Sequence, residues 1–299
     1  MHIRGIVVKP YIIFNPVAGP LCPRGNVIDE LKKLKPIALR VTQRKGDAEK
    51  WARDALLSKA NIIIVAGGDG TLNEVVNGLR SRTRRLPIGI LPRGTGNDFA
   101  RTLGLPSSIA ENIEIIRRRK TRAIDLVRVR SKRSRYFVNV SAGGFSGVVD
   151  EKLTRRIKRA WGPLAYLRGA AAALPQLHAY KTRIILDDDE ELSSELYNVV
   201  VANGRFVAGG LPIAPTADPA DGLLEIVLIP KIGAAELALL AAEIVLGKHL
   251  SANATIFRRA KKVVVRSRPG MCFNVDGELV AHAPATFQVL RHAMDFIVK

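Results

Sequence analysis

The chain has 299 residues, of which 47% are hydrophobic and 25% charged, so it can build a full core and is not largely disordered. Its 47 lysines and arginines outnumber its 27 aspartates and glutamates, and the net charge of +20 favours partners that carry negative charge: nucleic acid, an anionic membrane or phosphate groups. The only cysteines, Cys22 and Cys272, exclude a disulfide framework and a cysteine metal site, and they favour a reduced, cytoplasmic compartment.

Segments that could anchor the chain in a membrane are short. The N-terminal run Met1–Val8 does not have the pattern of a secretory signal. The longest apolar stretch, Ile232–Leu246, contains Glu236 and Glu243 and is too short to span a bilayer. We therefore expect a protein that is not integral to a membrane.

In chain order, the first 120 residues alternate strand-like and helix-like segments. The expected elements are a strand at Tyr11–Phe14 with a turn at Asn15–Gly19, a helix at Asp47–Leu57 with Asp47 as its N-cap, a strand at Asn61–Ala66, a helix at Leu72–Leu79 and a strand at Ile88–Leu91. The continuous β-branched run of Asn61–Ala66 is typical of a buried parallel strand. This order predicts an α/β domain with a mainly parallel sheet.

The character of the chain changes after the basic run Arg117–Arg122, which places a domain boundary near Arg122. Two helical segments follow, at Leu153–Leu174 and Ala234–Leu246, and the tail Thr286–Lys299 is strand-like. The other segments read as strands: Leu126–Val129, Tyr136–Val140, Thr182–Leu186, Leu196–Val201, Leu223–Ile229, Lys262–Val265 and Met271–Val275. We expect a second domain that is rich in β-structure.

The strongest local signal is the segment Gly67–Thr71, here called the first glycine loop, which lies between a buried strand and a helix. Glycines let the main chain approach a phosphate without obstruction by Cβ, and the helix N-terminus supplies N–H donors and partial positive charge. The carboxylate of Asp69 cannot attract a bare phosphate, so we expect it to act through Mg²⁺ or a nucleotide hydroxyl. The alternative is a plain turn between strand and helix.

A second glycine loop, Pro92–Asp98, also follows a buried strand. Loops that follow neighbouring parallel strands meet at one edge of the sheet and form a single crevice. The turn Asn15–Gly19 after the first strand can supply a third wall. Three such loops predict a phosphate site more strongly than any one of them.

Taken together, the motifs resemble the diacylglycerol kinase/sphingosine kinase catalytic family, and within it the soluble bacterial lipid-kinase branch. The resemblance covers nearly the whole chain in the family's order. The residues that carry it are Asn15-Pro16 with Gly19, Gly67–Glu74 with Asn77-Gly78, Pro92–Asp98, Val138–Val140 with Gly143–Phe145, Ala202–Gly204, Ile213–Pro215, Asp221–Leu224 and Val275–Glu278.

This resemblance implies an α/β fold with two domains and ATP in the cleft between them. Residues 1–122, joined by a returning C-terminal strand at 287–299, would form an α/β domain like those of NAD kinases and phosphofructokinases, and residues 123–286 would form a β-sandwich for the lipid and a metal. The resemblance also implies nucleotide contacts at Asn15, Thr42, Gly67, Gly68, Asp69, Gly70, Thr71, Asn73, Glu74, Thr95 and Asn97.

The segment Asp276-Gly277-Glu278 is the candidate catalytic segment. Transfer of a phosphoryl group to a lipid alcohol needs a partner that orients the hydroxyl and accepts its proton. The family places its general base at the residue that corresponds to Asp276, with Glu278 beside it. An isolated Asp-Gly pair is otherwise most often a hairpin turn.

The resemblance also implies a structural Mg²⁺ held by Asp221 and by the carbonyl of Leu223. One carboxylate and one carbonyl suit Mg²⁺, which prefers a few oxygen ligands and water. Asp125 would support this site through a basic residue, for which Arg168 is the candidate. The sequence departs from the family pattern at Asp218 and Ala220, where a lysine and an acid are expected.

We therefore expect a Mg²⁺- and ATP-dependent kinase that phosphorylates a lipid hydroxyl in the cytoplasm, at the anionic inner surface of the membrane, with diacylglycerol as the first candidate acceptor. Basic runs such as Lys132–Arg135 would favour this peripheral contact. The alternatives are an NAD kinase, which shares the first glycine loop, and a basic nucleic-acid-binding protein, which the 5% aromatic content disfavours. The choice of acceptor and the oligomeric state, including a homodimer, are left open.

Overall fold

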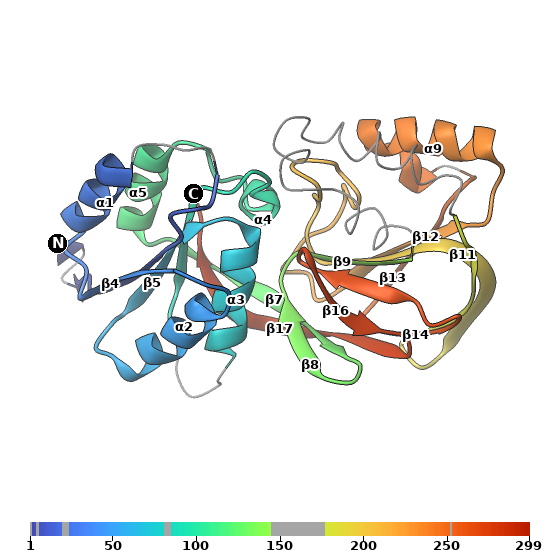
Figure 1. Cartoon of the computed structure of the whole chain (residues 1–299), viewed down its shortest axis with the longest axis horizontal. Helices are drawn as coiled ribbons and strands as arrows, with labels where there is room; N and C mark the ends of the chain where they lie inside the picture. Colours follow the sequence, from blue (N-terminus) through green and yellow to red (C-terminus); the bar gives the residue numbers. More distant parts are fainter. Residues whose placement is uncertain (1, 4–5, 20–23, 81–84, 145–176, 252) are drawn as a thin grey trace. The chain divides into compact units, whose positions relative to one another are not determined.

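The computed structural model describes residues 2–3, 6–19, 24–80, 85–144, 177–251 and 253–299 (Figure 1). The chain divides into two compact units. Unit 1 comprises Met1–Ile124 and His292–Lys299, and unit 2 comprises Asp125–Arg291. The helix expected at Leu153–Leu174 lies outside the described residues.

Strands and helices alternate in unit 1. After the short pair β1 (His2–Ile3) and β2 (Ile6–Val7), its elements are β3 (Pro10–Phe14), α1 (Arg24–Lys33), β4 (Ala38–Val41), α2 (Asp47–Leu57), β5 (Ile62–Gly67), α3 (Asp69–Leu79), β6 (Ile88–Pro92), α4 (Asp98–Thr102) and α5 (Ile109–Arg118). The strands pair in parallel in the order β4-β3-β5-β6, as the buried apolar runs predict.

Alternate side chains of each strand point to opposite faces of this sheet, and helices cover both faces. Ile12 and Ile64 pack with Leu31 of α1 and Ile116 of α5 in one apolar cluster. On the other side of the sheet, α2 and α3 lie together (Figure 1). They approach so closely that a Cβ added to Gly78 would lie 2.4 Å from the carbonyl oxygen of Glu49.

Two expectations about helix starts in unit 1 are wrong. Helix α2 spans Asp47–Leu57 as predicted, but its N-cap is Gly46, and Asp47 is its first helical residue. The carboxylate of Asp47 instead accepts hydrogen bonds from the main-chain N–H groups of Gln43 and Arg44. Helix α3 begins at Asp69 rather than Leu72, because Gly68 is extended and the helix forms directly from the first glycine loop.

Unit 2 is built mainly from antiparallel strands. Its elements are β7 (Thr121–Arg130, which begins in unit 1), β8 (Ser134–Phe137), β9 (Val140–Gly144), β10 (Tyr180–Leu186), β11 (Glu190–Ala202), β12 (Leu224–Pro230), α9 (Ala234–Leu246), the 3₁₀ turn η2 (His249–Ser251), β13 (Ile256–Ala260), β14 (Lys262–Arg268), β15 (Cys272–Val275) and β16 (Glu278–His282). The predicted strand Tyr136–Val140 is divided between β8 and β9.

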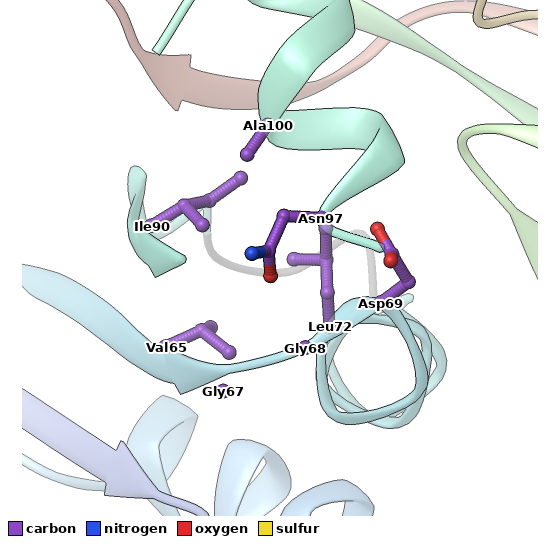
Figure 2. A pocket seen from close by; sticks show the side chains of 8 residues that line it. All are labelled: Val65, Gly67, Gly68, Asp69, Leu72, Ile90, Asn97 and Ala100. Atoms are coloured by element: carbon purple, nitrogen blue, oxygen red, sulfur yellow. The ribbon is translucent and has the colours of Figure 1, made fainter. Parts of the chain in front are cut away.

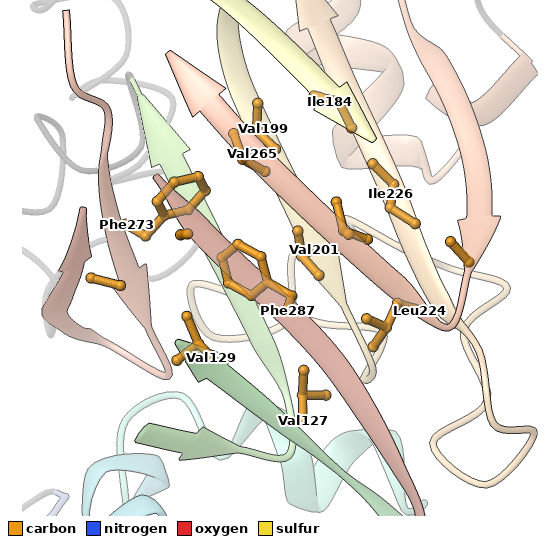
Figure 3. Close-up of a cluster of buried hydrophobic side chains, with 14 of the residues drawn as sticks. Val127, Val129, Ile184, Val199, Val201, Leu224, Ile226, Val265, Phe273 and Phe287 are labelled. Carbon is orange, nitrogen blue, oxygen red and sulfur yellow. The ribbon is translucent and has the colours of Figure 1, made fainter. Parts of the chain in front are cut away.

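Inward-facing residues of these strands form one large apolar core. Figure 3 shows Val129, Val199, Val265 and Phe273 pointing toward one another from different strands, with Phe287 among them. The rings of Phe273 and Phe287 meet edge to face, with centroids 5.2 Å apart. Apolar residues on the inward side of each strand therefore build the core of unit 2.

One long strand, β17 (Ala285–Ile297), belongs to both units. Its first residues pair antiparallel with β14, and Phe296 pairs in parallel with Ile88 of β6. Phe296 is fully buried against Phe99, with ring centroids 5.2 Å apart. The predicted fold class, an α/β unit plus a β-rich unit, is confirmed. Among the described residues, no helix is long and apolar enough to cross a bilayer.

Candidate active site

The carboxyl ends of β3, β5 and β6 bring three loops of unit 1 to one edge of the sheet. The strand order reverses between β3 and β5, which is the position where open parallel sheets bind ligands. Asn15, which follows β3, donates from its Nδ2 to the Oγ1 of Thr71 in α3 over 2.9 Å. The first two loops are thus joined by a direct bond at the expected crevice.

The two glycine loops touch through their main chains. A Cβ added to Gly68 would lie 2.9 Å from the Cα of Gly94, and a Cβ added to Gly94 would lie 2.6 Å from the Cα of Gly68. Only glycine at both positions permits this approach. Within the second loop, Asn97 accepts from the N–H of Gly94 and donates to its carbonyl, each over 2.7 Å. The side chain of Asn97 therefore fixes the shape of the second loop at the residue that touches the first loop.

Asp69 is the first residue of α3 and lies at the junction of the two loops. Its Oδ1 accepts from the N–H of Phe99 over 3.2 Å. Although part of the residue reaches the surface, protein atoms crowd its carboxylate, and this burial raises its pKa above the ordinary value in spite of main-chain donors. Figure 2 shows Asp69 and Asn97 beside a small pocket, with Gly68, Val65 and Ile90 among the other lining residues.

Not all predicted nucleotide residues have free side chains. Asn73 is buried, and its main-chain and side-chain oxygens both accept from Asn77. Glu74 accepts from the N–H of Ala48 over 3.1 Å and so links α3 to the start of α2. Their contacts are thus structural, and their nucleotide role stays a prediction.

The other predicted nucleotide residues lie near the edge of the sheet where the loops meet. Thr42 follows β4, and its N–H donates to the carbonyl of Phe14 over 2.8 Å. Thr95 is exposed at the tip of the second loop, and Gly70 is exposed in the first turn of α3. Gly67 packs so tightly on Thr71 that an added Cβ would lie 2.7 Å from its side chain.

Two residues at this edge were not predicted as site residues. Asp98 is buried, and its carboxylate and that of Asp69 both flank Gly96, where an added Cβ would lie 3.1 and 3.0 Å from them. Gly19 has a φ of 79°, and an added Cβ would lie 1.8 Å from the carbonyl oxygen of Arg93. Asp98 belongs to the second glycine loop, so its position in that motif was the available signal.

In unit 2, Asp276 occupies the tight turn between β15 and β16, with a φ of 45°. Its carboxylate accepts from the N–H of Val140 over 3.0 Å and from that of Val138 over 3.3 Å. Its own N–H donates to the carbonyl of Val140 over 3.0 Å. The carboxylate is therefore oriented by a strand that lies far away in the sequence. Glu278 begins β16, and its side chain lies outside the described residues.

Of the predicted metal residues, Asp221 forms an ion pair with Arg259, which was not a predicted ligand. The Oδ1 of Asp221 accepts from the N–H of Leu223 over 2.9 Å, and its Oδ2 pairs with the guanidinium of Arg259. Asp125 is fully buried and accepts from the N–H of Gly222 over 2.7 Å. The described residues contain no cluster of three or more potential metal-binding side chains, and Arg168 lies outside them.

This donor set does not fit a dication without rearrangement, because a guanidinium already balances the charge of Asp221. Glu225 lies close enough for the charges of Arg259 and Asp221 to influence it, and burial raises its pKa. Its Oε1 accepts from the hydroxyl of Thr216 over 2.7 Å. The Mg²⁺ site at Asp221 and Leu223 stays a prediction, and it competes with the pair formed by Asp221 and Arg259.

Comparison with known proteins matches each of the two units to a protein family. Residues 9–129 match the model of the diacylglycerol kinase catalytic domain, and residues 139–298 match that of the YegS C-terminal NAD kinase beta sandwich-like domain. A curated relative, the diacylglycerol kinase of Staphylococcus haemolyticus, is 34% identical over 288 residues, which cover 95% of this chain and 86% of the relative.

Solved structures agree with these matches. A diacylglycerol kinase from Bacillus anthracis superposes with a TM-score of 0.75 at 25% identity, covering 97% of both chains. Yeast NADH kinase in complex with NADH has a TM-score of 0.56 at 12% identity, covering 98% of this chain and 84% of that one, and therefore shares the fold alone.

Proposed function

Because the chain belongs to the diacylglycerol kinase catalytic-domain family, we propose that it transfers the γ-phosphate of ATP to the hydroxyl of a lipid, and that this lipid is diacylglycerol. The observation that carries the proposal is the contact between Gly68 and Gly94, which joins two glycine loops beside the N-terminus of α3. Such an edge offers main-chain N–H groups and partial positive charge to a chain of phosphates.

The nucleotide contacts follow from this edge. The first turn of α3 faces phosphate oxygens through Gly70 and Thr71, and Asn15 and Asn97 hold the surrounding loops in place. Because Gly68 is the N-cap and has no side chain, it leaves the helix N-terminus accessible to an anion. Thr42 and Thr95 flank the edge on its outer sides.

Asp69 and Asp98 are the residues that would hold Mg²⁺ together with the phosphates. Their carboxylates flank the same glycine, Gly96, and oxygen ligands are those that Mg²⁺ prefers. The ion, when bound, neutralises charge that develops on the transferred group. The N–H of Phe99 orients the carboxylate of Asp69 for this role.

Asp276 is the proposed general base. The new bond joins the lipid oxygen to the γ-phosphorus, the bond from that phosphorus to the β,γ-bridging oxygen breaks, ADP leaves, and the hydroxyl proton passes to Asp276. The N–H groups of Val138 and Val140 fix the orientation of its carboxylate. Glu278 is assigned a supporting role beside it. We place the reaction in the cytoplasm at the anionic inner surface of the membrane.

The test is transfer of radiolabel from [γ-³²P]ATP with Mg²⁺ to a panel of acceptors in mixed micelles: diacylglycerol, monoacylglycerol, phosphatidylglycerol, ceramide, sphingosine and NAD. We expect label on diacylglycerol, with no transfer when Mg²⁺ is chelated. Preferential labelling of another lipid would overturn the choice of acceptor. Labelling of NAD alone would overturn the lipid kinase assignment and restore the NAD kinase alternative.

A further inference from the structure

Helix α9 has an unusual composition for a helix at the surface of unit 2. Its 13 residues, AAELALLAAEIVL, include only two charged side chains, Glu236 and Glu243. Glu236 accepts from the N–H of Gly233 and so caps the helix start. A helix that is apolar on all sides is ordinarily buried. Among the residues of α9, however, only Leu240 is classed as buried.

The inner side of α9 accounts for few of these apolar residues. Leu240 is fully buried, and Ile244 packs on a cluster that includes Val140, Val200 and Ile213. At about 100° per residue, the glutamates fall at one edge of this buried side. The helix therefore uses one narrow stripe to attach itself to unit 2.

The opposite side of α9 is exposed and carries no polar side chain. Leu239, Val245 and Leu246 are 64%, 40% and 67% exposed. Exposed alanines lie between or directly beside them around the helix: Ala234, Ala235, Ala238 and Ala242. We call this side the apolar face of α9. It contributes three of the seven large hydrophobic side chains that are exposed in the described residues, so the exposure is concentrated rather than scattered.

An exposed lysine lies at each end of the apolar face, Lys231 before the helix and Lys248 after it. The ammonium group of Lys231 pairs with the carboxylate of Glu195 over 3.1 Å at the surface, so it reaches a phosphate only by exchanging this partner. Long lysine side chains can keep their ammonium groups among phosphate head groups while apolar neighbours enter the acyl region. The whole chain carries a net charge of +20, which also favours an anionic surface. At 13 residues the helix is too short to span a bilayer, so it would lie along the surface.

From this arrangement we infer that the apolar face of α9 docks on an anionic lipid surface, with Lys248 contacting phosphate head groups and the net positive charge of the chain adding to the attraction. The inference rests on the proposed function, since a lipid surface is where a lipid acceptor would be found. It assigns the contact to one helix rather than to the basic runs at Arg117–Arg122 and Lys132–Arg135.

The test measures co-sedimentation of the full chain, without ATP, with vesicles of phosphatidylcholine and phosphatidylglycerol and with vesicles of phosphatidylcholine alone. The variant L239Q/L246Q should reduce partitioning onto the mixed vesicles by about tenfold or more. The matched control is L57Q, because Leu57 ends α2 in unit 1 and is 90% exposed. This control should bind like wild type. Binding should be weaker on neutral vesicles and should fall with salt.

Several outcomes would overturn the inference: equal binding by wild type and L239Q/L246Q, an equal loss in L57Q, or no binding by wild type. A concentration-dependent wild-type dimer in sedimentation velocity that L239Q/L246Q abolishes would assign the face to a second copy. A lower Tm in that variant, retained in the milder L239A/L246A, would assign it to packing within the chain.

A kinase assay separates failure of this inference from failure of the proposed function. With monomeric dioctanoylglycerol as acceptor, L239Q/L246Q should keep wild-type turnover, while its turnover on diacylglycerol in mixed vesicles should fall. If neither wild type nor the variant labels any lipid, but wild type still binds mixed vesicles more strongly than L239Q/L246Q, the proposed function fails and the docking face stands.

Discussion

The loop edge of unit 1 and the carboxylate turns of unit 2 are built in different ways. At the edge, main chains touch directly, as Gly68 and Gly94 show, and an added methyl group would separate them. In unit 2, the carboxylates of Asp276 and Asp221 gather donors from distant strands. The loop edge should therefore respond to a change in side-chain volume, and the turns of unit 2 to a change in side-chain charge. Substitutions that change only one of these properties therefore test the distinction.

The largest expected effect is that of D69N. We expect kcat/KM for lipid phosphorylation to fall by roughly 10³-fold or more, because a carboxylate proposed to hold the phosphate-bound metal is lost. The protein should keep or raise its Tm at neutral pH. Burial raises the pKa of Asp69, so the charged form costs stability above the folded pKa, and asparagine removes that cost.

The matched control for D69N is D47N, since Asp47 is also the first residue of a helix in unit 1. Hydrogen bonds from Gln43 and Arg44 lower the pKa of Asp47, so its charge stabilises the fold above its unfolded pKa, and this contribution fades as the pH falls. D47N should therefore lower the Tm at neutral pH and leave turnover unchanged. Thermal denaturation should therefore show a lower Tm for D47N but not for D69N. Wild-type turnover by D69N would refute the assignment.

The second expected effect is a fall in kcat of roughly 10²–10⁴-fold for D276N, with little change in ATP affinity, because an amide cannot accept the proton. The control is D187N. Asp187 also has positive φ, at 50°, and accepts from two main-chain N–H groups, those of Lys261 and Lys262, each over 2.8 Å. Both variants should lose similar stability. An equal kcat in D276N and D187N would show that Asp276 only stabilises its turn and is not the general base.

A volume change should separate two glycines of the same loop. G68A forces a methyl group against Gly94 and should cost about 1–3 kcal/mol of stability, measured by urea unfolding. A Cβ on Gly70 would meet nothing within 4 Å in the structure as described, so G70A should gain up to about 1 kcal/mol from helix propensity. G70A should nevertheless weaken ATP binding in calorimetry, since the methyl group enters the proposed phosphate site. Unchanged ATP affinity in G70A would move that site away from α3.

The smallest effect concerns Arg259. R259Q removes the partner of Asp221 and should cost between 0 and about 1 kcal/mol, because this ion pair is partly exposed. If Mg²⁺ must displace the guanidinium, then Mg²⁺ should raise the Tm of R259Q more than that of wild type. R258Q is the control, since Arg258 pairs with Glu190 instead. An equal response of all three proteins to Mg²⁺ would exclude Asp221 as a competing metal ligand.

The sequence predicted unit 1 better than unit 2, for physical reasons. The run Asn61–Ala66 and the observed strand β5 differ by only one residue at each end, because a β-branched run followed by glycines defines a buried parallel strand locally. Loops that follow parallel strands meet at one edge, so the contact of the two glycine loops followed from strand order. The start of α3 was missed because glycines gave no helical periodicity to detect.

In unit 2 the important contacts depend on antiparallel register, which local patterns do not determine. Asp276 meets Val138 and Val140 only because β15 pairs with β9, and Asp221 meets Arg259 only because β12 pairs with β13. The family resemblance indicated Asp276 and Asp221 as functional residues but said nothing of these partners. Arg259 had no motif that would have singled it out.

The path of β17 has a consequence for synthesis of the protein on the ribosome. Residues 292–297 complete the sheet of unit 1 beside β6, and Val298 donates to the carbonyl of Lys120 over 2.9 Å. Phe296 fills the core beside Phe99, so a nascent unit 1 emerges with an open sheet edge and an unfilled site for that ring. The sheet of unit 1, which carries the loop edge, is therefore completed only after unit 2 has been translated, and a premature stop near His292 would damage the unit encoded first.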